Sequence, residues 1–184
     1  KIHIHTNTPA KLYKICSAYG KVVDRKVDDM TKQEHTIHHT ESSGIAIVVD
    51  SGADIPDEYA NEIQVVPVRY SFGNQQHIDK VTQTTSEFYQ QMKVDVNHPK
   101  TSQPTPGDFK KIYNFISSHY NSIISIHLSK KMSGTFQSGI NAAKSIKVKN
   151  IKVIDSYSAS VGLGLLALYA VDLKQSGKTY SQIV

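Results

Sequence analysis

Ile123-Ile-Ser-Ile-His-Leu128 decides the fold, because a short run of mostly β-branched residues is typical of a buried strand. On either side of this run, the hydrophobic pattern alternates between the periods of helices and strands. It predicts helices over 106–118 and 135–146 and strands over 45–50 and 151–154. This alternation predicts an α/β fold, in which a parallel sheet carries helices on both faces.

Further elements complete the prediction. In the main part of the chain we expect a strand over 65–70 and helices near 57–62, over 85–93 and over 159–175. At the N-terminus the sequence predicts a small α/β fragment, with strands at Ile2–Thr6 and Val22–Val27 and a helix at Pro9–Tyr19.

Small hydroxyl residues precede two of the predicted helices. The first loop is Thr101-Ser-Gln-Pro-Thr-Pro-Gly-Asp-Phe109, in which Thr105 is suited to an N-cap and Asp108 to a capping box. The second loop is Ser133-Gly-Thr-Phe-Gln-Ser138. Helix starts favour a carboxylate or a phosphate, and ligands of open α/β sheets bind beyond the carboxyl ends of the strands. We therefore expect the two loops to share one anion, although each loop taken alone is more simply an ordinary N-cap.

A series of motifs, in this order, resembles the DegV family. The motifs are Gly44-Ile-Ala-Ile-Val-Val-Asp-Ser-Gly-Ala-Asp-Ile-Pro56, Val65-Val-Pro-Val-Arg-Tyr-Ser-Phe-Gly73, Glu87-Phe-Tyr-Gln-Gln-Met92, the two hydroxyl loops, and Val153-Ile-Asp-Ser156 with Gly162-Leu-Gly164. The resemblance covers residues 44–184 and implies a fatty-acid-binding module that carries its ligand and does no chemistry. The chain departs from the family at Gly52, where Thr is usual, and this puts one hydroxyl contact in doubt.

The resemblance also implies a ligand site. By the family pattern, Thr101 and Ser133 hold the carboxylate of a C14–C18 fatty acid, and we assign their neighbours Ser102, Gly134 and Thr135 to the same site. It implies no cofactor and no metal in this segment. The family has a second α/β domain that covers the acyl chain, so we expect the lipid site to be incomplete in a chain that ends at Val184.

The N-terminal segment resembles a different family. Residues 1–30 look like the end of the middle domain of fatty acid kinase subunits, and the polar residues 31–43 are typical of a linker. Residues 44–184 then form the DegV-like domain. The resemblance implies a fatty acid kinase domain as partner, in the same chain or separate, to which the module presents its ligand for acyl-phosphate formation. Whether the full protein is an enzyme therefore stays open.

An alternative class of function is a phosphate- or nucleotide-binding α/β enzyme, with Mg²⁺ held by Asp50 or Asp155 at a strand end. The absence of a P-loop sequence counts against it. His127 lies near Ser129 and Ser133, which suggests a hydrolase. We disfavour that function, because there is no nucleophile-elbow sequence and no acid is placed to orient the imidazole.

Two histidines near the N-terminus need a separate interpretation. His3 and His5 are two residues apart on the predicted strand, so both side chains face the same side, as metal ligands often do. Two ligands do not complete a zinc site, and an exposed pair is the simpler expectation.

The last predicted helix carries an apolar stripe. Val161, Leu165 and Leu168 lie on one line of it, and such a stripe usually packs against the core. Gly162 and Gly164 lack the pattern of a dinucleotide fingerprint and indicate close packing of the helix.

Composition limits the remaining classes of function. The 184 residues have a net charge of +5, but no basic patch interleaved with aromatic rings, so nucleic-acid binding is not expected. A mildly basic surface is compatible with transient contact with an anionic membrane. The single cysteine, Cys16, excludes an intramolecular disulfide, and its apolar neighbours favour a packed core thiol. The sequence lacks a membrane-spanning run and a signal peptide, so we expect a cytoplasmic protein.

Overall fold

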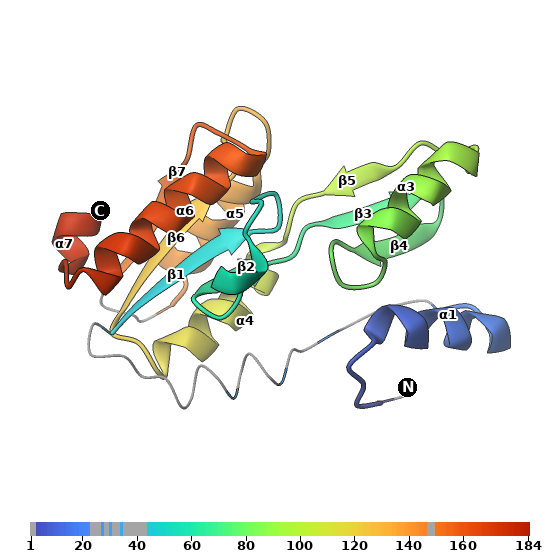
Figure 1. Cartoon of the computed structure of the whole chain (residues 1–184), viewed down its shortest axis with the longest axis horizontal. Coiled ribbons are helices and arrows are strands. Elements are labelled where there is room, and N and C mark those ends of the chain that lie inside the picture. Colours follow the sequence, from blue (N-terminus) through green and yellow to red (C-terminus); the bar gives the residue numbers. More distant parts are fainter. Residues whose placement is uncertain (1–2, 23–26, 28–29, 31–33, 35–43, 147–149) are drawn as a thin grey trace. The chain divides into compact units, whose positions relative to one another are not determined.

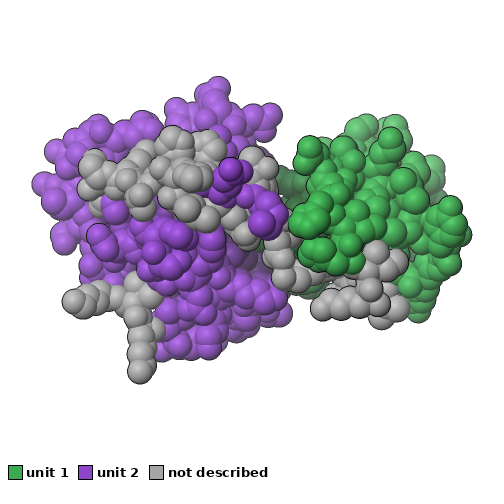
Figure 2. Space-filling view, turned by 90° about the horizontal axis from the view of Figure 1, so that it is seen from below, with its two compact units in different colours: residues 1–28, 67–102 green, residues 29–66, 103–184 purple. Residues whose placement is uncertain are grey.

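The computed structural model describes residues 3–22, 27, 30, 34, 44–146 and 150–184. It divides into two compact units (Figure 2). Unit 1 comprises residues 1–28 and 67–102, and unit 2 comprises residues 29–66 and 103–184. Most of the predicted linker and of the predicted strand at Val22–Val27 falls outside the described residues.

Unit 2 is built on a four-stranded parallel sheet in the order β2-β1-β6-β7 (Figure 1). The strands are β1 (Ile45–Asp50), β2 (Ile63–Val66), β6 (Ser122–His127) and β7 (Asn150–Asp155). Every residue of β1 and β6 is buried, which is typical of parallel strands covered on both faces. The prediction of a parallel sheet is confirmed.

Helices cover both faces of this sheet. They are α4 (Pro106–Ser117), α5 (Thr135–Lys144) and α6 (Ser160–Gln175), with a 3-10 turn η1 (Asp57–Tyr59) and a short α7 (Tyr180–Ile183). Successive side chains of a strand point to opposite faces, so Ile47 packs in one core cluster with Leu163 of α6, and Val48 packs in the other with Phe109 of α4. The predicted two-sided arrangement is therefore correct.

Unit 1 contains a small sheet that was not predicted from the sequence. Its antiparallel strands, in the order β4-β3-β5, are β3 (Arg69–Phe72), β4 (Gln75–Ile78) and β5 (Lys100–Ser102), and the unit also holds α3 (Thr85–Val94). Phe88 of α3 lies 5.2 Å from Tyr70 and 5.6 Å from Phe72 between ring centroids. The prediction of one strand over 65–70 is wrong, because Pro67 has no backbone N–H and separates β2 from β3.

Of the two predicted N-terminal elements that the described residues test, only the helix is present. Helix α1 (Pro9–Tyr19) is present, but none of its residues is buried, and Cys16 is half-buried rather than a core thiol. His3 to Thr6 form no strand, and the exposed rings of His3 and His5 meet edge to face at 5.0 Å. No helix in the described part of the chain is long and apolar enough to cross a membrane.

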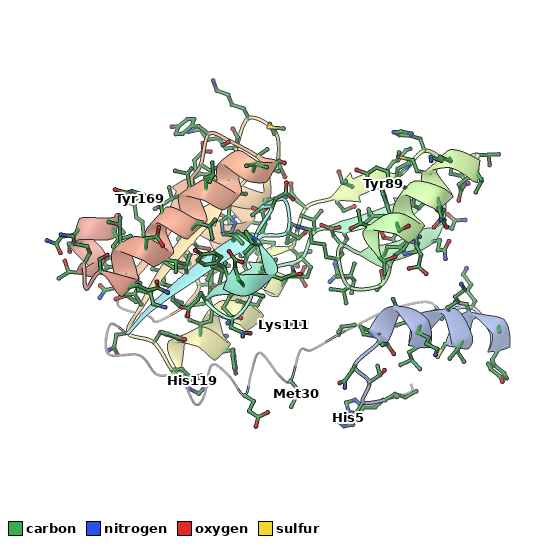
Figure 3. The ribbon with its side chains drawn as sticks, in the orientation of Figure 1. His5, Met30, Tyr89, Lys111, His119 and Tyr169 are labelled. Carbon is green, nitrogen blue, oxygen red and sulfur yellow. The ribbon has the colours of Figure 1, made fainter. Side chains whose placement is uncertain are left out.

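The predicted apolar stripe of α6 packs against the core at Leu168 but not at Val161 and Leu165. Val161, Leu165 and Tyr169 are about 60% exposed, and Figure 3 labels Tyr169 on this helix. The buried side contains Leu163, Gly164, Ala167, Ala170, Val171 and Lys174. This helix is apolar almost all round, so hydrophobicity could not identify its packed side. The small residues on the buried side allow it to lie close to the sheet.

Candidate functional site

The candidate site begins where three neighbouring strands end. Asp50, His127 and Asp155 are the last residues of β1, β6 and β7. Because these strands are parallel and adjacent, the three residues and the loops that follow them lie at the same edge of the sheet. The second hydroxyl loop starts here.

Ser133 ends a tight turn directly before α5. The carbonyl of Ser129 accepts hydrogen bonds from the amides of Met132, at 2.9 Å, and Ser133, at 3.1 Å. The Ser133 hydroxyl accepts a bond from the amide of Thr135 at 3.2 Å and lies 2.8 Å from the Thr135 hydroxyl. Gly134 is the N-cap residue and has no side chain to offer the helix. Ser133 therefore supports the helix start, and its role as an anion ligand stays a prediction.

Gln103 joins the two hydroxyl loops within unit 2. Its side-chain amide donates to the hydroxyl of Ser138 at 3.3 Å and lies so close to Gly134 that a Cβ at that position would overlap it. Gln103 is not among the residues predicted for the site, which are hydroxyl residues of the two loops and Gly134. The signal was present, since Gln103 lies in the middle of the first loop motif.

Thr105 is an N-cap, as predicted. Its hydroxyl accepts from the amide of Asp108 at 3.2 Å, and the Asp108 carboxylate accepts from the Thr105 amide at 2.9 Å. This capping box with Pro106 at the first turn satisfies the start of α4 from within the chain.

Thr101 and Ser102 do not lie in a loop before a helix. Both are exposed residues of β5, where Thr101 is paired with Tyr70 and Ser102 with Arg69. They belong to unit 1, whereas Ser133 belongs to unit 2. A carboxylate shared by Thr101 and Ser133 stays a prediction.

Unit 1 also has a cleft of about 330 Å³, lined by Ser71, Gly73, Val96, Asn97, His98 and Lys100, which contains none of the predicted ligand residues.

A buried chain of hydrogen bonds runs beneath the site. The Tyr113 hydroxyl lies 2.8 Å from the hydroxyl of Ser125, which lies 2.6 Å from Nε2 of His127, and Nδ1 of His127 lies 3.1 Å from Asp50. All four side chains are 0% exposed. Burial raises the pKa of Tyr113, so its hydroxyl stays protonated and acts as a donor.

These hydrogen bonds correct the prediction made for His127. An acid does orient the imidazole, and it is Asp50, which comes 77 residues earlier in the sequence. The serine next to the imidazole is Ser125, and neither Ser129 nor Ser133 is bonded to it. Ser125 is closed to substrate by burial, so the arrangement resembles a catalytic triad in composition without access to the nucleophile.

The two aspartates proposed for Mg²⁺ are engaged with the protein. Asp50 is fully buried and accepts from two backbone amides and His127. Asp155 accepts from the amides of Lys130 and Tyr157, with the Lys130 ammonium 3.7 Å away. Among the described residues, no group of three or more His, Cys, Asp or Glu is able to hold a metal ion. His3 and His5 therefore belong to no such group in the described part of the chain.

Family models match nearly the whole chain. A model described as an uncharacterised protein of the DegV family matches residues 44–184, and one described as the middle domain of FakA-like fatty acid kinase proteins matches residues 1–37. The chain belongs to the DegV family. This confirms the family resemblance that the sequence motifs indicated.

DegV relatives are about twice as long as the segment they share with this chain. A DegV domain-containing protein of Staphylococcus aureus (strain MRSA252) is 39% identical over 140 residues, which cover 75% of this chain and 50% of the relative. A DegV domain-containing protein of Listeria monocytogenes is 32% identical over 143 residues, 76% of this chain and 50% of the relative. The chain therefore spans about half the length of the curated relatives it matches.

Solved structures agree with this fold. A DegV family protein from Thermus thermophilus, described by its fatty acid binding, is 30% identical with a TM-score of 0.70, over 76% of this chain and 50% of that chain. DegV from Bacillus subtilis, described as a fatty acid binding protein, is 31% identical with a TM-score of 0.72, over 77% of this chain and 51% of that chain.

Proposed function

We propose that this DegV module binds a long-chain fatty acid and that the start of α5 holds its carboxylate. Ser133 and Thr135 offer hydroxyls at a helix start, where backbone amides and the helix dipole favour an anion. In this proposal Thr101 is the second hydroxyl on the carboxylate, and Ser102 and Gly134 border it. The single observation that supports it most is the pair of hydroxyls of Ser133 and Thr135 at the start of α5, where Gly134 supplies no side-chain cap, in a chain similar to the fatty-acid-binding proteins of Thermus thermophilus and Bacillus subtilis.

The module is proposed to be a carrier. Its buried His127 and Ser125 have no access to a ligand, so neither is placed to act as nucleophile or general base. The match of residues 1–37 to a kinase middle domain supports a further step, in which the carrier presents its fatty acid to a fatty acid kinase for acyl-phosphate formation. We assign residues 1–30 to that middle domain, 31–43 to a linker and 44–184 to the carrier. Such a carrier would work in the cytoplasm and contact membrane surfaces transiently.

A binding titration distinguishes this function from the phosphate-binding alternative. The intact protein, stripped of lipid, is titrated with oleate in a calorimeter, and in parallel with inorganic phosphate and with ATP in the presence of Mg²⁺. We expect oleate to bind saturably, and we expect no binding of inorganic phosphate or of ATP with Mg²⁺. Binding of ATP or phosphate without binding of oleate would contradict the proposal and favour an enzyme.

A further inference from the structure

The buried carboxylate of Asp50 accepts hydrogen bonds from two loops next to the candidate site. Its Oδ1 accepts from the amide of Gly52 at 3.0 Å, and its Oδ2 accepts from the amide of Leu128 at 2.9 Å and from Nδ1 of His127 at 3.1 Å. The side chain is 0% exposed. A buried charge is tolerated only when hydrogen bonds replace its hydration, so these three donors must stay in place.

Two of the three donors lie in the loops that follow β1 and β6. Leu128 is the first residue after β6, and the next residue, Ser129, closes the turn that ends at Ser133 through its carbonyl oxygen. Gly52 lies in the turn after β1, and its carbonyl accepts from the amide of Ser160 at 2.9 Å, at the start of α6. One carboxylate therefore fixes where the Ser133 turn starts and connects the turn after β1 to α6.

The third donor fixes a proton on the imidazole. A carboxylate accepts hydrogen bonds only, so Nδ1 of His127 carries a proton and donates the bond to Asp50. The other ring nitrogen, Nε2, lies 2.6 Å from the Ser125 hydroxyl, whose oxygen accepts from Tyr113. His127 is therefore the third donor to the Asp50 carboxylate.

We propose that Asp50 is a positioning residue of the ligand site. It does not touch the ligand, and acts by holding the amide of Leu128 so that Ser133 and the first amides of α5 meet the carboxylate in one fixed arrangement. This role rests on the fatty-acid binding proposed above and adds to it a residue that determines affinity from beneath the site.

The test compares Asp50→Asn with Ser125→Ala in the intact protein. An Asn amide has one acceptor oxygen and no charge. In one orientation the amide of Leu128 faces an NH₂ group, and in the other Leu128 keeps only a neutral hydrogen bond while the amide of Gly52 faces the NH₂ group. We expect Asp50→Asn to weaken oleate binding about tenfold, the scale of one lost charge-assisted hydrogen bond. Ser125→Ala disturbs the same buried chain but leaves all donors to Asp50 in place, so it should lose stability and keep its affinity for oleate.

Equal loss of affinity in the two variants, or no loss in Asp50→Asn, would overturn the proposal. A measurement on the wild type covers the case in which Asp50→Asn does not fold. The ¹⁵N chemical shifts of the His127 ring should show a protonated Nδ1, and an unprotonated Nδ1 would refute the arrangement. If the wild type binds no oleate, the proposed function fails separately. The Ser133 amide resonance then decides the positioning role, because Asp50→Asn must shift it strongly for the proposal to stand.

Discussion

Replacing Ser133 with alanine is expected to weaken the binding of a long-chain fatty acid about 10- to 100-fold in the intact protein. The variant loses a hydroxyl hydrogen bond to a charged carboxylate, which contributes about 1.5–3 kcal/mol. Titration with oleate measures the loss, and titration with the corresponding fatty alcohol separates the head group from the chain. The alcohol should bind the wild type and the variant with similar affinity.

Thr101→Val is also expected to weaken fatty-acid binding. The double variant should lose less binding free energy than the sum of the two single variants, because in this proposal both hydroxyls bind one carboxylate.

A matched control separates ligand binding from helix capping. Thr105 also presents a hydroxyl at a helix start, but its hydroxyl is engaged in a capping box with Asp108. Thr105→Ala should therefore cost about 1 kcal/mol of stability without changing oleate affinity. If Ser133→Ala behaves like this control, Ser133 is only part of a helix start and the carboxylate is held elsewhere.

Gly164→Ala is expected to lower the free energy of unfolding by about 1–3 kcal/mol, the usual cost of overpacking. A Cβ at this position would overlap the carbonyl oxygen of Asp54. A shift of this backbone would break other interactions. The amide of Asp54 donates to the carbonyl of Ser160 at 3.3 Å, and Ala53 and Ser160 form a parallel bridge. Urea denaturation followed by circular dichroism measures the change.

Gly162→Ala, two residues earlier in the same helix, is the control. A Cβ there meets chiefly the hydroxyl of Ser158, the end of a side chain that can rotate away. Alanine also favours the helix over glycine by about 0.8–1.0 kcal/mol, so we expect little net change or a slight gain. A loss as large as that of Gly164→Ala would show that the close approach at Asp54 is not what constrains this helix.

The sequence predicts the elements of unit 2 well because their signals are local. β1 is apolar up to its last residue, β6 is rich in isoleucine, and α4 begins at the capping box of Thr105 and Asp108. The small sheet of unit 1 has no comparable signal, since its strands have three or four residues and β4 begins with the exposed pair Gln75-Gln76. In α6 the periodicity predicts the helix but not its packed side.

The candidate site is predicted in part for the same reason. Ser133 and Thr135 stand in a recognisable motif at a helix start, and the structure places them there. The partnership of Asp50 and His127 depends on the pairing of β1 with β6, which no local pattern reveals. Ser125 and His127 lie two residues apart on one strand and therefore face the same side. That spacing could have identified their contact.

The most direct test of fatty-acid binding is to extract the purified intact protein with organic solvent and to identify its lipid by mass spectrometry. Wild-type protein should carry C14–C18 fatty acids, and the Ser133→Ala protein should carry markedly less of them. Wild-type protein that carries no fatty acid, and takes up none when it is incubated with oleate, would contradict the claim that this DegV module binds fatty acids.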